Sequence, residues 1–465
     1  MQVRKLTNRR EFLRLASLGA ASAAILAACA PSAPPTAAPA SKPTEPAKPA
    51  EAAKPTAAAA AAPAKRPSGP ITFLCRNDIV TAYNVEPIIA EWNKTHDSKV
   101  TMEKPAGDVR QKAAAAIAAG DMVWDGFSVA VSPYDNQVWV KQQLIQPMDD
   151  LIKASTEPDA DKVLPGMIGT IRESVKVDGK VYFVPGNVGS YVLQWFWDPL
   201  KEIGVTKQPE TWDETAEIAR KLKAKFPDKI PYAAINTPGA DFIGLMWSAV
   251  KPSEIIKDNK MNITHPDAVA GLKWMKSLAK EKLTPTVTTD VNANWDKGGV
   301  VMMMAYDVKG QHAQKTYGYD KADTGVTILK EKGNIASGTH FWMNGSVIFN
   351  KAKNPQGMMD FFLWWFGPSN EPAQKTMIAT AAKPCYQYTY DKYVKDDPKF
   401  KWENLGIELV AKSAPYPVNT YWTIENNALR PWIEKFMADD STIGAEDAMA
   451  SAAKDRDAEI AKQKI

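Results

Sequence analysis

The residue of this chain with the clearest chemistry is Cys29, which follows Leu26 and two alanines. A cysteine behind small residues is typical of a lipoprotein box, in which the thiol takes a diacylglycerol and the chain is cleaved just before it. Upstream, Asn8–Arg14 has the pattern of a twin-arginine export signature. The 14 residues of Leu15–Ala28 are too few to cross a hydrocarbon core of about 30 Å. We therefore expect residues 1–28 to be a lipoprotein signal peptide, with a lipid on Cys29 that holds the protein on the outer face of the membrane.

Side chains suited to catalysis or metal binding are scattered along the chain. There are four histidines and no HExxH or CxxC pattern, so their spacing indicates no zinc site. The Gly-rich phosphate loops and the GxSxG elbow are also missing. We predict no catalytic residue, no metal and no cofactor. Two carboxylates that converge only in the fold would leave no spacing signature, so an exported lipoprotein enzyme stays open as an alternative.

An acidic cluster lies at Glu157–Asp161. It lacks the glycine and the terminal glutamate of a calcium loop, so it is predicted to be a solvated turn. Cys75 and Cys385 are the two cysteines beyond Cys29. Because twin-arginine export carries proteins already folded in a reducing cytosol, we expect both to be free, buried thiols and not a disulfide.

The composition separates a tether from a folded part. Residues 29–69 are dominated by Ala, Pro, Lys and Glu, so they cannot bury enough surface to fold and are expected to be a disordered tether. The first 68 residues hold ten basic and three acidic side chains out of 57 and 53, which leaves 47 and 50 and a net charge of −3 for the rest. No basic field for nucleic acid remains. The remaining length, roughly 395 residues, suits two domains.

The elements that follow alternate between strands and helices. Residues 71–75 form an apolar run rich in β formers, and Val85 to Trp92 has helical spacing. Another strand is expected at 100–102, an Ala-rich helix at 109–119 and a third strand at 126–131. This β-α-β-α-β order predicts a parallel sheet with helices on its faces, and therefore an α/β fold.

The pattern changes after residue 174. Asp178 and Gly179 predict a hairpin turn within 175–184, and Thr211–Glu214 is a capping box that opens a helix. Residues 185–190 are predicted to interrupt the strands. Further strands are expected at 191–197, 300–306 and 346–350, and further helices at 265–280, 355–366 and 445–463.

Several segments, read in order, resemble the extracytoplasmic solute-binding proteins of ABC importers, and specifically their carbohydrate-binding, maltose-binding-protein-like group. Asp178–Pro185 resembles the family's "DGK-Y-x-x-P" strand, and Gln194–Leu200 stands where the family has "YYNKDLF". Pro209–Glu214 matches "P-TW-E" and is the most distinctive element. Lys297–Met302 resembles "GKAAM", and Lys351–Phe362 resembles "SKNPEAAxxFL". The resemblance covers nearly all of residues 70–465.

The resemblance implies a type II clamshell of two α/β lobes, each discontinuous in sequence. Lobe 1 would comprise residues 70–189 and 305–344, and lobe 2 residues 190–304 and 345–465, with crossings near Ser190, Met304 and Gly345. A monomeric protein of this kind would trap a carbohydrate between its lobes and deliver it to the transmembrane subunits of an ABC permease. A polyamine, peptide or osmolyte is the alternative solute, and a cationic one would need several carboxylates to converge with the aromatic side chains.

The expected binding residues combine flat rings with short polar groups. Fifteen tryptophans are an excess for this length, and sugar rings stack on Trp and Tyr while their hydroxyls bond to small polar side chains. Strand-end loops at the carboxyl edge of a parallel sheet bring such groups together. Trp247 fits the core as well as the ligand site. The candidates are Asn77, Asp78, Ser128, Ser132, Tyr134, Asn187, Ser190, Trp247, Tyr306, Asp307, Trp342 and Trp422.

Overall fold

The structure is a computed structural model that describes residues 69–462 with the exception of ten short stretches. These stretches are 106–108, 120–121, 132, 234–237, 286–289, 334–339, 380–382, 398–409, 411–413 and 416–420. The predicted signal peptide, Cys29 and nearly all of the predicted tether lie outside the described residues. Within them, no helix has both the length and the apolar character that crossing a membrane requires.

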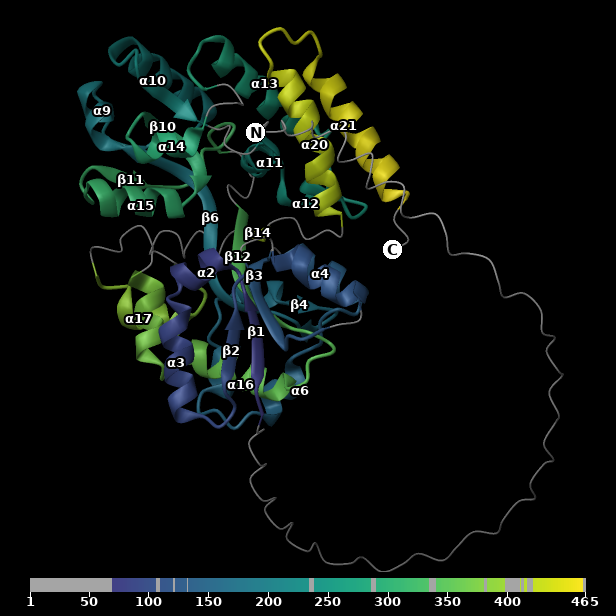
Figure 1. The fold of residues 1–465 in the computed structure, drawn as a ribbon. Helices are drawn as coiled ribbons and strands as arrows, with labels where there is room; N and C mark the ends of the chain where they lie inside the picture. The colour runs from purple at the N-terminus through teal and green to yellow at the C-terminus, as the bar shows by residue number, and fades with distance from the viewer. Residues whose placement is uncertain are drawn as a thin grey trace, which may run out of the picture. The chain divides into compact units, whose positions relative to one another are not determined.

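The first three strands form the parallel sheet that the sequence predicts. β1 (Ile71–Cys75) lies between β2 (Val100–Glu103) and β3 (Gly126–Val131) and pairs with both in parallel. The helices α3 (Val85–Thr95) and α4 (Val109–Ala119) make the connections between these strands. Figure 1 shows α3 beside this group of strands. The apolar residues of α3, which are Val85, Ile88, Ile89 and Trp92, are buried.

Two long strands extend this sheet. β12 (His340–Ile348) pairs antiparallel with β3, and β6 (Val184–Phe196) pairs antiparallel with β12. The sheet then continues through β10 (Val300–Tyr306) to β7 (Ile230–Ala233), in the order β2-β1-β3-β12-β6-β10-β7. Three short strands join at the sides: β11 (Ala322–Thr324), β13 (Lys383–Pro384) and β14 (Ala414–Pro415).

Helices and two small hairpins complete the described part of the chain. The helices between β1 and β7 are α2 (Asn77–Ala82), α5 (Pro133–Lys141), α6 (Asp149–Ala154), α7 (Ala160–Val163), α8 (Gly169–Ser174), α9 (Trp197–Glu202) and α10 (Trp212–Lys225). The later helices are α11 (Pro238–Ala249), α12 (Pro252–Ile255), α13 (Pro266–Lys280), α14 (Val291–Asp296), α15 (Val308–Tyr317), α16 (Pro355–Phe366), α17 (Glu371–Ala379), α18 (Gln387–Tyr393), α20 (Trp422–Met437) and α21 (Ala445–Ile460). The hairpins are β4 (Lys176–Val177) with β5 (Lys180–Val181), and β8 (Ile256–Lys257) with β9 (Lys260–Met261).

The local signals in the sequence act as predicted. Asp178 and Gly179 have φ of 49° and 77° between β4 and β5, as a tight hairpin turn requires. Thr211 caps α10, because its side chain accepts a hydrogen bond from the Glu214 backbone N–H at 3.2 Å. Glu214 in turn accepts from the backbone N–H of Glu210 at 2.7 Å. Cys75 and Cys385 are free and buried.

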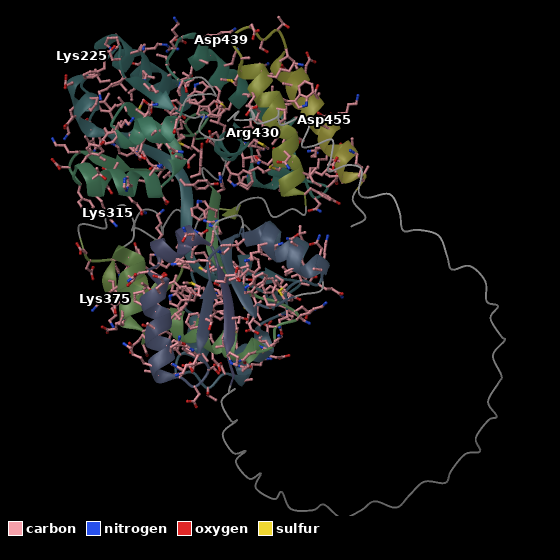
Figure 2. All side chains as sticks on the ribbon, in the orientation of Figure 1. Lys225, Lys315, Lys375, Arg430, Asp439 and Asp455 are labelled. Carbon is pink, nitrogen blue, oxygen red and sulfur yellow. The ribbon has the colours of Figure 1, made fainter. Side chains whose placement is uncertain are left out.

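The buried side chains form two lobes, each with its own core. The core of the first lobe joins residues 71–188 to residues 341–410. The second lobe joins residues 191–328 to residues 429–452, and its strands carry apolar side chains on both faces. Charged side chains such as Lys225, Arg430 and Asp455 are exposed and project from the helices (Figure 2). The α/β fold class is therefore as predicted, with each lobe discontinuous in sequence.

The boundaries of the lobes differ from the prediction. Residues 305–328 pack in the second lobe and residues 345–410 in the first, the reverse of the expected assignment. β6 passes from the first lobe to the second near Ser190, as predicted, and β12 contains Gly345, the position of another predicted passage. The predicted passage at Met304 is wrong, because β10 pairs there within the second lobe. The third passage lies between Val410 and Leu429. β10 and β12 are both buried apolar strands, so hydrophobicity alone does not tell which of them crosses.

β6 is longer than predicted. Its 13 residues include the stretch 185–190, which the sequence analysis treats as an interruption. This stretch contains Gly186 and Gly189, and its backbone pairs with β12 on both sides of a register shift at Asn344/Gly345, where Gly186 is left without a partner in β12. Glycine is needed at position 189 because a side chain of the neighbouring strand approaches closely. A Cβ on Gly189 would lie 2.7 Å from the Trp342 indole.

We predict that Gly345→Ala destabilises the protein by about 1–3 kcal/mol, because the strands cannot separate to admit the added carbon. A Cβ at this position would lie 2.3 Å from the Val184 carbonyl oxygen and 2.7 Å from the Pro185 Cα. Urea unfolding followed by fluorescence measures the change. Gly169→Ala is the control, because a Cβ there meets nothing within 4 Å. An equal effect of the two substitutions would contradict this account of β12.

Candidate functional site

The two lobes meet where β6, β10 and β12 lie side by side, and the strand register brings five predicted binding residues to this place. Trp342 pairs with Gly189 and Asn344 with Asn187 across β12 and β6. Tyr306 of β10 lies opposite Tyr191 of β6, and Asp307 follows Tyr306 at the start of α15. We call this region the crossing site. The predicted residues in it are Asn187, Ser190, Tyr306, Asp307 and Trp342.

Aromatic rings form a continuous group in the crossing site. Tyr306 meets Trp342 edge to face, with centroids 5.3 Å apart, and Tyr191 in the same way at 5.6 Å. His340 is stacked on Tyr191 at 5.2 Å and meets Trp247 of α11 edge to face at 5.6 Å. Tyr306 and Trp342 are half-buried, whereas Tyr191, Trp247 and His340 are buried. The rings at the accessible end are therefore Tyr306 and Trp342.

An amide pair joins β6 to β12. Asn187 Oδ1 accepts a hydrogen bond from Asn344 Nδ2 at 3.0 Å and a second, short one from the Tyr83 hydroxyl. Burial raises the pKa of Tyr83 well above its usual value, so the hydroxyl stays protonated and donates. Ser128 of β3 is buried, and its hydroxyl donates to the Gly345 carbonyl oxygen at 3.2 Å. These bonds fix the backbone of both crossing strands.

The carboxylates of the crossing site are already engaged. Asp307 forms an ion pair with Lys383, and both side chains are buried. Asp307 Oδ2 also accepts from the Ser190 backbone N–H at 3.1 Å. Asp241 of α11 accepts a hydrogen bond of 2.6 Å from the Tyr191 hydroxyl. The charge of Asp307 is therefore compensated by Lys383, and Asp241 is engaged by a hydroxyl donor.

His340 adds no charge either. Desolvation by burial lowers its pKa from 6.5 to about 3, so the imidazole is neutral at physiological pH. Burial also raises the pKa of Tyr191 well above its usual value. The crossing site is thus rich in aromatic rings, its imidazole is neutral, and its Asp307 carboxylate is paired with Lys383.

Several buried polar atoms at the crossing site have no hydrogen-bond partner among the described residues. They come from β6, β12 and α11, and they include two indole donors, one amide acceptor and two hydroxyls. A buried polar atom without a partner costs about 1–3 kcal/mol, so each one marks a position where a further hydrogen bond would be favourable. These atoms are Ser190 Oγ, Trp247 Nε1, Trp342 Nε1, Asn344 Oδ1 and Ser346 Oγ.

The remaining predicted residues have other positions. Asn77 is exposed at the start of α2, so the predicted strand-end pair is helical. Asp78 lies in the same helix, Tyr134 lies in α5 and Trp422 begins α20. Ser132 lies outside the described residues. Trp247 is 2% exposed and packs in the core of the second lobe, and it contacts the crossing site through its ring against His340.

The sequence analysis missed several members of the crossing site. Tyr83, Tyr191, His340 and Lys383 carry no local motif, and only the pairing of distant strands brings them together. Asn344 was noticeable, because the sequence has Asn344-Gly345 directly before Ser346 in an apolar run. An amide in a buried strand must find a partner, and that expectation would have singled it out.

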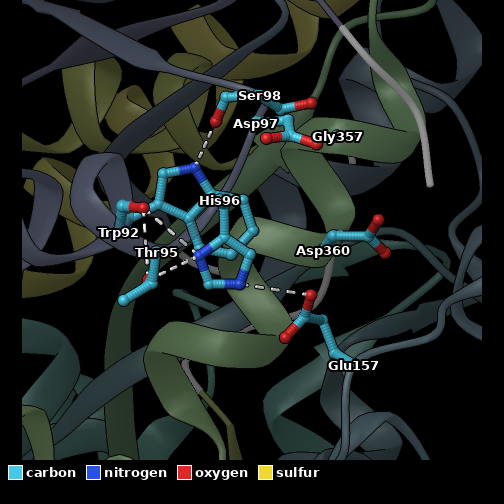
Figure 3. A pocket seen from close by; sticks show the side chains of 8 residues that line it. All are labelled: Trp92, Thr95, His96, Asp97, Ser98, Glu157, Gly357 and Asp360. Atoms are coloured by element: carbon cyan, nitrogen blue, oxygen red, sulfur yellow. Dashed lines mark hydrogen bonds and ion pairs between the residues drawn. The ribbon is translucent and has the colours of Figure 1, made fainter.

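A separate pocket lies within the first lobe, at the C-terminal end of α3 (Figure 3). Its cavity volume is about 70 Å³. His96 is stacked on Trp92 with centroids 3.5 Å apart, and its Nε2 is 3.4 Å from Glu157 Oε1.

Glu157 and Asp159 are buried, so the prediction of a solvated turn is wrong for them. Asp159 accepts from the Ser369 backbone N–H at 2.7 Å, which shows that these acids tie the turn to the lobe. Within the described residues, no three His, Cys, Asp or Glu side chains are grouped as a metal site requires.

The comparisons with known proteins agree on one family. The model of the bacterial extracellular solute-binding protein family matches residues 87–401. A probable ABC transporter-binding protein of Deinococcus radiodurans is 22% identical over 300 residues, which are 62% of this chain and 66% of that relative's length.

Solved structures match over most of this chain. An ABC substrate-binding protein from Listeria monocytogenes, in complex with cycloalternan, has a TM-score of 0.70 at 18% identity, over 85% of this chain and 100% of the other. The maltose-bound MalE3 of T. maritima has a TM-score of 0.68 at 19% identity, over 84% and 99%. The two-lobed α/β fold is therefore that of these solute-binding proteins.

We predict that the buried His340 makes the protein less stable in acid. The unfolded imidazole takes up a proton near pH 6.5 and the folded one only near 3, so the folded state binds fewer protons in between. Stability therefore falls as the pH drops below 6.5, by up to about 1.4 kcal/mol per pH unit. His340→Phe should reduce the difference in unfolding free energy between pH 7 and pH 4.5. The exposed His312, changed to Gln, is the control and should keep the parent's pH dependence. An unchanged dependence in His340→Phe would refute the assignment.

Proposed function

The chain belongs to the bacterial extracellular solute-binding proteins, and we propose that it captures a carbohydrate between its two lobes and delivers it to the permease of an ABC importer. It would act by binding, without catalysis and as a monomer. Solute capture by two lobes is favourable because each lobe contributes contacts, and the arrangement that encloses the solute is one that a permease can distinguish. The permease subunits are the expected protein partner.

The observation that carries this proposal is the combination of rings and unpaired polar atoms at the crossing site. Trp342 offers an indole face and an indole N–H without a partner among the described residues, and Asn344 offers an amide oxygen on the same face of the strand pair, while the Ser190 hydroxyl lies on the opposite face. Sugars present flat C–H faces and a dense set of hydroxyls, which both donate and accept. A sugar hydroxyl would satisfy these atoms at little cost, because they are already desolvated.

The charge of the site favours a neutral sugar over a polyamine or another cation. A cationic solute needs carboxylates that are free to pair with it, since an unpaired charge is expensive to bury. Asp307 is compensated by Lys383, and Asp241 is bonded to the Tyr191 hydroxyl. The similar proteins of known structure support the same choice, because the one from Listeria monocytogenes was solved with cycloalternan and the one from T. maritima with maltose.

The remaining binding candidates are part of the proposal on other grounds. Trp422 occupies a position similar to a stacking tryptophan of the maltose-binding group, and Asn77, Asp78, Ser132 and Tyr134 follow the strands of the first lobe. A solute with more than one sugar ring would extend from the crossing site towards such residues. Ser128 would act indirectly, through its bond to the β12 backbone.

The N-terminal segment gives the proposed location. A lipid on Cys29 would anchor the protein to the outer face of the membrane, and a tether of about 40 residues would let the folded part meet its permease. The twin-arginine signature would direct export of the folded chain.

A thermal-shift screen against mono- and oligosaccharides tests the function. A solute that binds only the folded protein raises the melting temperature. At a solute concentration a hundred times Kd, the free energy of unfolding increases by roughly 2.7 kcal/mol. Putrescine and spermidine are included as cationic competitors. A shift with polyamines and none with sugars would overturn the carbohydrate assignment, and hydrolysis of a bound glycoside would favour the enzyme alternative.

We predict that Trp342→Ala removes most of the sugar-induced shift, because it deletes the stacking face and the unpaired indole donor together. Trp432→Ala is the matched control: this tryptophan is also half-buried, but it bonds to Asp455 at the surface of the second lobe. Trp422→Ala tests the second stacking candidate in the same way. Equal shifts in Trp342→Ala and the parent would remove the crossing site from the proposal.

We predict that Cys29→Ser leaves the exported protein soluble, because no thiol is available for the lipid. Replacing Arg9 and Arg10 by Lys should instead keep the chain in the cytoplasm. Fractionation of cells into membrane and soluble parts, with an antibody to the folded part, distinguishes the two outcomes. Membrane attachment of Cys29→Ser would show that another segment is the anchor.

A further inference from the structure

Asp307 is not directed outward from the crossing site but into a buried ion pair. Its carboxylate is paired with the Lys383 ammonium, and the two side chains are 2% and 1% exposed. The same carboxylate accepts from the Ser190 backbone N–H at 3.1 Å, and the Asp307 backbone N–H donates to the Ser190 carbonyl oxygen at 3.0 Å. The side chain also stands at the N-terminus of α15, where the helix dipole favours a negative charge.

The two partners of this ion pair belong to different lobes. Lys383 lies in β13, which pairs with β6 at Val188, and the adjoining Cys385 packs in the core of the first lobe. Asp307 connects β10 with α15, whose Ala313 packs in the second lobe. The pair therefore spans the point at which β6 passes from one core to the other.

Burial gives the pair a strong preference for one arrangement of the lobes. Two opposite charges in a low-dielectric interior attract each other strongly, and either charge left there alone costs several kcal/mol. A change at the crossing that separates β13 from α15 must break the pair or admit water to it. The ion pair is connected to the crossing site through β6, because Ser190 bonds to Asp307 while the neighbouring Gly189 and Asn187 pair with Trp342 and Asn344.

We propose that the Asp307–Lys383 ion pair is a lock between the lobes, which holds the solute-binding arrangement of the crossing site and sets the affinity without touching the solute. The effect on solute affinity rests on the proposed function. The effect on the arrangement of the lobes does not, because it can be measured without solute. It changes the role of Asp307 from a binding residue to a positioning residue. Lys383, which no sequence motif indicates, becomes equally important.

The lock is tested first in the absence of solute. Spin labels on Lys94→Cys in the first lobe and Lys225→Cys in the second, both exposed positions, report the distance between the lobes in the full chain with Cys29→Ser. Cys75 and Cys385 are buried and stay unlabelled. We expect Lys383→Met to add a second distance population. An unchanged distribution would overturn the proposal.

A second buried ion pair provides the matched control. Arg456 and Glu425 are paired at 3.8 Å within the second lobe, with side chains 9% and 0% exposed. Arg456→Met should lower the melting temperature and leave the distance distribution as in the parent, because both partners move together. A second population in Arg456→Met would mean that any buried charge defect loosens the lobes, and it would overturn the specific role of Asp307 and Lys383.

The double variant Asp307→Asn, Lys383→Met covers the case in which Lys383→Met fails to fold. Removing both charges avoids an unpaired buried ion, so the double variant should melt closer to the parent than either single variant does. It should still show the second distance population. A double variant that folds and keeps the parent's distribution would also overturn the lock.

Affinity is measured last, with the sugar that gives the largest shift in the parent. A smaller population of the competent arrangement raises the apparent Kd in proportion, and we expect at least a tenfold increase in the double variant. A changed distance distribution with an unchanged Kd would overturn the part of the proposal that concerns affinity. If the parent binds no sugar, the proposed function fails, while the distance measurement still decides whether the lock exists.

Discussion

Strand β6 belongs to both cores, and this shared strand is the constraint on which the rest of the structure depends. Its first half pairs with β12 in the first lobe and its second half with β10 in the second, so the sheets of both lobes share this strand. Backbone hydrogen bonds make the crossing strands stiff along their length. Any movement of one lobe against the other must therefore be absorbed within a few residues around Ser190.

The polar residues near the middle of this strand have a physical reason. A strand buried on both faces is usually a run of Val, Ile and Leu, yet β6 has Asn187, Ser190 and Gln194 in its interior. Asn187 is bonded to Asn344 and Tyr83, and Gln194 donates to the Ala305 carbonyl oxygen at 3.1 Å. A strand of this kind is held by specific bonds as well as by packing, which gives the crossing one defined register.

The sequence predicts the local structure of this protein much better than its site. The capping box at Thr211, the hairpin turn at Asp178 and the order of the first three strands each depend on residues close in the chain, and all three are confirmed. The assignment of lobes differs because it depends on which of two buried strands passes between the lobes, β10 or β12, and this is decided by pairing with distant strands. The roles of Lys383 and His340 could not be predicted either, because their contacts are with residues more than 30 positions away in the sequence.

Charge compensation explains how a neutral site can be built from charged residues. An unpaired Asp307 would attract cations, and an unpaired Lys383 would attract anions. Either charge alone would also be unfavourable to bury. Paired, they cancel each other's field and still fix the backbone at Ser190 through the carboxylate. Under the proposed function, such a site would recognise shape, ring faces and hydroxyl positions, which are the features by which neutral sugars differ from one another. Such a pair also makes the geometry of the site depend on the contact between the lobes, so that recognition and lobe arrangement become one equilibrium.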